Sequence, residues 1–309
     1  MSENMKNEAV KNAPVKKTKK RRKPMAWFKR YFRILFGGLM LVVIFFFVFL
    51  GPVITPHDPD TVDMNNRYAG PSAEHWLGTD QFGRDYFARL AVGGMPTIAI
   101  ALVAQVLILA LGIVLGLLCG YYRPFDNVCM RIMEAIQNIP SLLTTIILAD
   151  LVRGAFEKVE GMGNIALVSG MISVIVALVL SGITSITRNL RGQVLRLRSL
   201  EFIEAEKAMG AGPFRTIFMH ILPQTMNYLV IRFGTGISSL VLTTASLSYL
   251  GIGLPTSTPN WGAMVSEGQS VMLLHPIMII WPGVCIVVLV FGFSLMGEGL
   301  RDVLDPKYR

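Results

Sequence analysis

Six long apolar stretches, separated by polar segments, set the pattern of this chain. Each approaches the length of about 20 residues that an α-helix needs to cross the hydrocarbon core of a bilayer. The third stretch is the weakest, because Gln137, Asn138 and Pro140 interrupt it. The pattern predicts an all-α, polytopic membrane protein with six transmembrane helices, and the stretches cover residues 34–54, 96–118, 130–152, 165–186, 228–250 and 276–296.

The first apolar stretch has the position of a secretory signal. A signal peptide has an apolar core of about 7–15 residues, followed by a cleavage site made of small residues. Here the core is longer, and the sequence GPVITPHDP follows it without an A-x-A pattern. We therefore expect an uncleaved first helix.

Basic residues concentrate on one side of this arrangement. The 33 residues at the N-terminus hold twelve Lys and Arg against two Glu, whereas the remaining 276 residues hold 17 Lys and Arg against 18 Asp and Glu. If this tail lies in the cytoplasm and six helices alternate, the inner segments hold 23 Lys and Arg and the outer segments hold five. Cytoplasmic loops carry such an excess, so both termini are expected inside.

These assignments divide the chain into three regions. Residues 1–33 form a basic cytoplasmic tail that we expect to be disordered and to set orientation or touch anionic lipid. Residues 34–94 contain the first helix and an extracytoplasmic loop, and residues 95–309 form the core. The longest inner loop covers residues 187–227.

The composition excludes other classes of protein. Hydrophobic residues make up 52% of the chain and charged residues 16%, whereas a soluble domain carries about a quarter charged residues. The net charge of +9 lies in the tail, so it does not indicate a surface for nucleic acid. A soluble globular protein, a disordered chain and a nucleic-acid-binding protein are therefore excluded.

The sequence shows no chemistry that would let the chain do work by itself. The middles of the six stretches carry no Asp, Glu, Lys, Arg or His, which ion-driven transporters often place at that depth. There is no G-x-x-x-x-G-K-[ST] loop to hold phosphate. The spacing of the three cysteines and four histidines indicates no metal site. We expect no catalytic residue, no metal and no cofactor on this chain, so energy must enter from elsewhere.

Two features of the apolar stretches are candidates for a transport pathway. Pro140 predicts a kink in the third stretch, which either shapes a pathway or only bends the helix to fit its neighbours. The fifth stretch carries a row of hydroxyls that form either the polar wall of a cavity or a tight packing seam. The row consists of Thr235, Ser239, Thr243 and Ser246.

Residues 199–223, within the inner loop, predict two short helices joined by a bend. Ser199 is placed to cap the first helix, Gly210 to end it and Pro213 to begin the second, which Pro223 ends. A helix of about ten residues is marginal alone, so the apolar face either docks on a partner or lies on lipid headgroups. That face is formed by Phe202, Ala205 and Met209, and then by Phe214, Ile217, Phe218 and Ile221.

The same segment resembles the E-A-A-x-x-x-G…I-x-L-P loop of ABC importer membrane subunits. It departs from that pattern at Glu206, where the family usually has alanine, and at His220, where the general pattern has isoleucine. The form with histidine is familiar in the peptide-transporter branch. The matching positions are Glu204, Ala205, Gly210, Leu222 and Pro223.

Other segments resemble the C-type permease of oligopeptide, dipeptide and nickel importers. Residues 247–253, 260–262 and 297–306 resemble its L-S-F-L-G-x-G, W-G and G-D-G-L-R-D-x-x-D-P elements. Residues 75–85 read HWLGTDQFGRD and resemble its H-x-L-G-T-D-x-x-G-R-D stretch, through positions whose role the sequence does not define: Gly78, Thr79, Asp80, Gly83, Arg84 and Asp85. The likeness covers about residues 34–309 and leaves the basic tail outside.

The resemblance implies a permease of the bacterial cell membrane that forms a heterodimer with a second permease. It further implies two cytoplasmic ATPases, which bind ATP and Mg²⁺ and grip the inner loop, and an extracytoplasmic binding protein that delivers substrate. The residues implied in coupling to the ATPases are Phe202, Glu204, Ala205, Glu206, Met209, Gly210, Pro213 and Pro223.

Alternatives to a peptide permease stay open at this point. A nickel importer has the same fold, although soft metal ligands are absent from the helix centres. An ion-coupled carrier or a channel is the competing class, and it would transport solute without an ATPase. A membrane-embedded enzyme would need paired carboxylates, a metal cluster or an activated nucleophile, and the sequence offers none.

Overall fold

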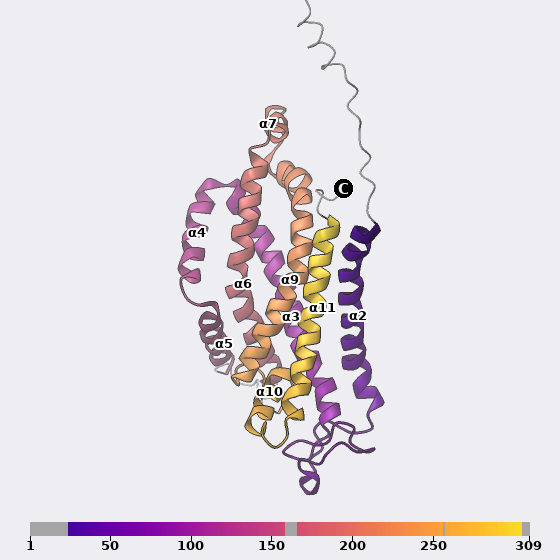
Figure 1. Cartoon of the computed structure of the whole chain (residues 1–309). Helices are drawn as coiled ribbons and strands as arrows, with labels where there is room; N and C mark the ends of the chain where they lie inside the picture. The colour runs from indigo at the N-terminus through magenta and orange to yellow at the C-terminus, as the bar shows by residue number, and fades with distance from the viewer. Residues whose placement is uncertain (1–23, 158–165, 256, 305–309) are drawn as a thin grey trace, which may run out of the picture.

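Long helices make up most of the computed structural model, which describes residues 24–157, 166–255 and 257–304 (Figure 1). Within these ranges there is no β-strand, and a single isolated bridge pairs Thr79 with Asp85. The first 23 residues of the predicted tail, Ile165 at the start of the fourth stretch, and the Asp305-Pro306 element lie outside the described residues.

Among the described residues, five helices are long and apolar enough to cross a membrane. Each helix extends beyond the apolar stretch that predicted it. Hydropathy identifies only the residues that lie in the hydrocarbon core, whereas the helix continues until its backbone hydrogen bonds end at a cap. The first one begins inside the segment predicted to be a disordered tail. The five are α2 (Pro24–Ile54), α3 (Tyr86–Tyr121), α6 (Ala166–Arg198), α9 (Leu222–Tyr249) and α11 (Ile277–Leu304).

The third predicted span is broken in two, which corrects the prediction of one kinked helix. It consists of α4 (Arg123–Gln137) and α5 (Ser141–Glu157), and the two axes meet at 97°. Pro140 lies between them, where it disfavours helical backbone at the residue before it. Counted as one crossing, the pair brings the number of spans in the described residues to six.

Small residues let α3 lie close to α6 in the centre of the bundle. A Cβ atom added at Gly112, Gly116 or Gly120 would come within 2.6, 2.8 and 2.5 Å of side-chain atoms on α6. The three glycines, one on each successive turn of α3, therefore form a packing seam against α6. Glycine at this spacing brings two helix backbones together where lipid supplies no hydrophobic drive.

The bundle has two distinct ends (Figure 1). One end, called here the α7 end, carries α7 (Glu201–Ala208), the start of α2 and the end of α11. There Arg33 Nη1 lies 3.0 Å from Asp302 Oδ2. The opposite end, called the α10 end, carries the loop before α3, with the short η1 (Met64–Asn66), and α10 (Trp261–Ser270).

Candidate functional site

Residues 199–223 form a compact hairpin at the α7 end, called here the α7 hairpin. It contains α7, the single turn α8 (Pro213–Arg215) and the π-helical η3 (Thr216–Ile221). Pro213 opens the second arm, as predicted. The predicted cap is wrong by one residue: Leu200 is the N-cap, while Ser199 Oγ donates to the carbonyl oxygen of Arg196 at 2.9 Å.

Pro223 does not end the second arm, which corrects the prediction. The helix continues from Pro213 through η3 into α9, up to Tyr249. In the π turn the N–H of Leu222 donates to the carbonyl oxygen of Ile217, five residues back. Such a wider turn relaxes the regular ladder just where a proline ring would clash with it and where its amide is missing.

The two faces of the α7 hairpin differ in their surroundings. Its inward face is buried in a cluster with residues of α3 and α6, and this cluster contains Ile203, Ile217, Ile221, Leu117, Leu190 and Val194. Other large apolar side chains of the hairpin are exposed, and together they are called here the apolar tip: Phe202, Met209, Phe214, Phe218 and Met219. The predicted stripe Phe202–Ala205–Met209 thus points away from the bundle, and the second predicted stripe is divided between the two faces.

The bend of the hairpin depends on Gly210. Its φ is +88°, in the left-handed region that favours glycine. Its N–H donates to the carbonyl oxygen of Lys207, and that of Ala211 donates to the carbonyl oxygen of Glu206. Gly210 therefore ends α7, as predicted.

The two departures from the E-A-A pattern lie next to each other. Glu206 is buried against the second arm, and its Oε1 lies 2.9 Å from Nε2 of His220 and 3.9 Å from Nε of Arg215. A buried carboxylate needs a positive partner. The acidic residue that replaces the usual alanine is thus matched by basic groups across the hairpin.

A second charged site lies at the α10 end and is centred on Asp80. Its Oδ1 accepts from the N–H groups of Phe82 and Arg84, at 2.8 and 3.0 Å. Its Oδ2 accepts from Arg84 Nε at 2.7 Å and lies 3.4 Å from Nε of Arg89. Asp80 therefore holds the loop before α3 in one conformation and places its single negative charge between two guanidinium groups.

The other residues of the H-x-L-G-T-D-x-x-G-R-D stretch also shape this loop. Gly78 and Gly83 have φ values of +79° and +73°. Thr79 Oγ1 accepts from the N–H of Ala69 at 2.9 Å, and Asp85 caps α3 by accepting from the N–H of Ala88 at 2.7 Å. The structure gives these positions a role in folding the loop.

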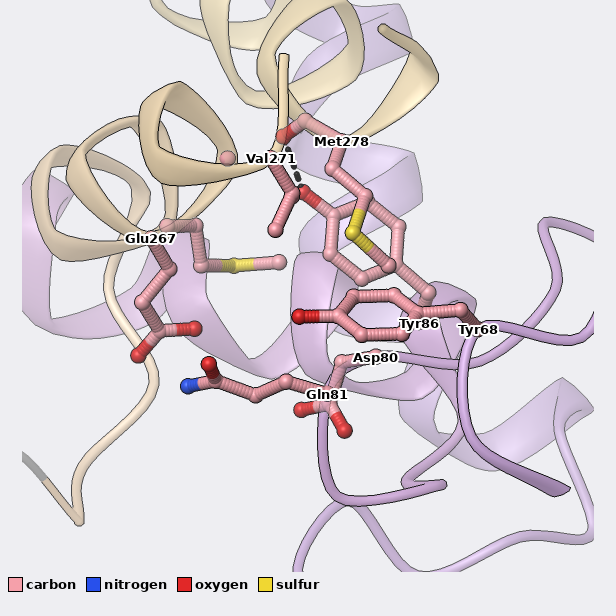
Figure 2. A pocket seen from close by; sticks show the side chains of 9 residues that line it. Tyr68, Asp80, Gln81, Tyr86, Glu267, Val271 and Met278 are labelled. Carbon is pink, nitrogen blue, oxygen red and sulfur yellow. Dashed lines mark hydrogen bonds between the residues drawn. The ribbon is translucent and has the colours of Figure 1, made fainter. Parts of the chain in front are cut away.

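Sequence reasoning missed two charged residues of this site. Arg89 is only 1% exposed, and its Nη2 lies 3.7 Å from Oε1 of Glu267 on α10. Figure 2 shows Glu267 on one wall of a small cleft, with Asp80 and Gln81 on the other. Burial raises the pKa of the Glu267 carboxyl, and the charge of Arg89 opposes that shift. The sequence signal that could have indicated this site was the position of Arg89, a charged residue just before the second apolar stretch.

The predicted pathway residues lie apart from both charged sites. Thr235, Thr243 and Ser246 donate to the carbonyl oxygens four residues back on α9, at 3.1, 2.9 and 2.8 Å. None of the row, Ser239 included, is fully buried in the described chain. Pro140 is exposed at the break between α4 and α5. Their part in a pathway stays a prediction.

Two protein-family models match the chain. The model described as "Binding-protein-dependent transport system inner membrane component" matches residues 112–309. The model described as "N-terminal TM domain of oligopeptide transport permease C" matches residues 25–71.

Curated relatives match over most of their length. The chain is 35% identical to the glutathione transport system permease protein GsiD of Pectobacterium atrosepticum, over 88% of this chain and 86% of the relative. It is 34% identical to the oligopeptide transport system permease protein OppC of Bacillus subtilis, over 88% and 85%. It is 32% identical to the dipeptide transport system permease protein DppC of Alkalihalophilus pseudofirmus, over 88% and 85%.

Proposed function

Because the chain belongs to the binding-protein-dependent inner membrane components, we propose that it forms half of an ATP-driven import pathway for short peptides. These components are the permease subunits of ABC importers, and within them the chain belongs to the oligopeptide permease C type. It is a multi-pass protein of the bacterial inner membrane. Permease subunits of this family are generally non-catalytic, so ATP hydrolysis is assigned to partner subunits, which hold ATP and Mg²⁺.

The observation that carries the proposal is the apolar tip of the α7 hairpin. Five large apolar side chains stand exposed on it, while its other face is fixed to α3 and α6. A partner that covers the tip can therefore move the bundle, because the second arm continues without interruption into α9. Such a rigid link transmits the movement of one packed element to another.

The proposed partner at this tip is a cytoplasmic ATPase, which requires the α7 end to face the cytoplasm. The excess of Lys and Arg in the segments assigned to that side supports this orientation. Glu204 is exposed on the same hairpin and offers a charge at the rim of the contact. An extracytoplasmic binding protein would then deliver substrate to the α10 end.

The pathway itself is proposed to lie between this chain and a second permease. The hydroxyl row of α9 and the break at Pro140 would contribute polar groups to it. The relatives named above transport glutathione, oligopeptides and dipeptides by name, which favours a peptide over a nickel ion as the substrate.

Met209→Asp tests the docking role of the tip. Met209 is 82% exposed, so the substitution leaves the fold intact but places a charge in the proposed contact. Charged residues are depleted from the cores of protein interfaces, and disrupting a central contact costs about 2 kcal/mol or more. We expect the recovery of ATPase subunits with the purified permease pair to fall by about tenfold or more.

The control is Met64→Asp, which changes a 57% exposed methionine at the α10 end. It should leave the recovery of ATPase at the wild-type level. Equal recovery of ATPase with both variants would contradict the proposed contact.

A further inference from the structure

Three potential metal ligands meet at the α10 end, in the loop between α2 and α3. They are the half-buried imidazoles of His57 and His75 and the buried carboxylate of Asp85, and one donor atom from each lies within 4.8 Å of the others. We propose that these three residues bind a divalent transition-metal ion of the Zn²⁺ type. The site is separate from the α7 hairpin and goes beyond the proposed function.

The donor set suits such an ion. Two imidazoles and one carboxylate are ligands that Zn²⁺ takes in sites with three protein ligands and one open position. The imidazole rings of His57 and His75 lie with their centroids 4.7 Å apart and their planes tilted by 36°. One ion can bind both rings in their neutral form.

Outer-shell contacts already orient two of the ligands. Nε2 of His57 lies 3.0 Å from the carbonyl oxygen of Glu74, and since a carbonyl only accepts, this nitrogen carries the proton. A neutral His57 therefore keeps its lone pair on Nδ1. Oδ1 of Asp85 accepts from the N–H of Ala88, which fixes the carboxylate, while Oδ2 lies 2.8 Å from Nδ1 of His75. Metal sites commonly hold their ligands in this way.

The neighbouring cations do not occupy this carboxylate. Arg84 pairs with Asp80 at 2.7 Å, and its guanidinium lies 4.6 Å from the centre of the Phe82 ring. Arg89 lies near Asp80 and Glu267. Among the described residues, the ion pair recorded for Asp85 is the one with His75. His75 is itself one of the three proposed ligands, so a bound ion would replace the proton that this pair shares and bind both side chains directly.

A bound ion would cross-link the loop. His57 follows the end of α2, whereas Asp85 is the N-cap of α3. The ion would join these two segments and favour the folded loop, because ligand binding to the folded state raises its stability.

Zinc binding by the complete transporter tests the proposal, with the permease purified through a tag that contains no histidine. His57→Ala removes one ligand and leaves the contact between His75 and Asp85 in place. The matched control is His275→Ala, at the same end, where His275 stacks on Tyr68 at 4.6 Å and has no part in the cluster. Bound zinc is measured after dialysis, and affinity by calorimetric titration.

We expect a single zinc site per chain in the wild type and in His275→Ala, and affinity reduced by about tenfold or more in His57→Ala. Chelation should lower the Tm of the wild type and leave that of His57→Ala unchanged. The proposal is overturned if the wild type binds no zinc, or if His57→Ala binds zinc as tightly as His275→Ala. Either result leaves the docking experiment with Met209→Asp unaffected, so the two proposals fail separately.

Discussion

Gly210→Pro is expected to reduce substrate uptake to background while the protein still inserts into the membrane. Proline holds φ near about −65°, whereas Gly210 has a φ of +88°. The substitution also removes the N–H that donates to the carbonyl oxygen of Lys207. The first arm of the α7 hairpin must then leave its place, and the apolar tip is no longer presented as one surface.

Uptake of labelled peptide by cells or proteoliposomes that contain the complete transporter is the measurement. Gly212→Ala is the matched control, because Gly212 has an ordinary φ of −75° and no atom of the described residues lies within 4 Å of the Cβ that would be added. It should transport like the wild type. If Gly210→Pro transports as fast as Gly212→Ala, the hairpin does not couple ATP hydrolysis to transport.

Gly83→Ala is expected to unfold the loop at the α10 end. The added Cβ would lie 1.7 Å from the carbonyl oxygen of Asp63, and the φ of +73° is strained for any residue with a Cβ. A backbone clash of this kind cannot be relieved by turning a side chain, and strained backbone alone costs about 1–3 kcal/mol. Loss of the loop would also release Asp80 and remove one of the two carboxylates that lie near the buried guanidinium of Arg89.

The Tm of the purified permease pair in detergent measures this effect. Gly70→Ala, in the same loop, is the control, because in the part of the chain that the structure describes no atom lies within 4 Å of its added Cβ. We expect Gly83→Ala to have a lower Tm than the wild type and to lose peptide uptake, whereas Gly70→Ala should match the wild type in both. Equal Tm values for the two variants would show that Gly83 does not define the loop.

Much of the fold was predictable, because a helix that crosses a bilayer requires a long run of apolar residues, which is visible in the sequence. The apolar stretches located five long helices and the broken pair. Gly210 and Pro213 marked the bend of the α7 hairpin correctly, since both residues act through their own backbone. The six residues at 78–85 were singled out by resemblance alone, and the structure supplies the physical role.

Features that depend on the surrounding backbone were not predictable. Two prolines had opposite outcomes: Pro140 separates two helices at 97°, whereas Pro223 lies inside a continuous helix. The π turn before Pro223 makes the difference, and no local pattern announces such a turn.

Contacts between residues far apart in the chain could also not be predicted from the sequence. Glu206 meets His220 because the hairpin folds back, and Arg89 meets Glu267 because α10 packs against α3. The spacing of the histidines along the sequence indicated no metal site, yet the folded loop brings His57 and His75 close to Asp85. Such charged groups can be recognised as candidates for a functional site only once their burial and their neighbours are known.

The most direct test of the central claim is peptide uptake into proteoliposomes that contain this chain and its partner permease, with and without the ATPase subunits. We predict uptake only when the ATPases, ATP and the binding protein are all present, and no flux through the permease pair alone. Sustained peptide flux by the permease pair without ATPases, under an ion gradient or none, would contradict the account.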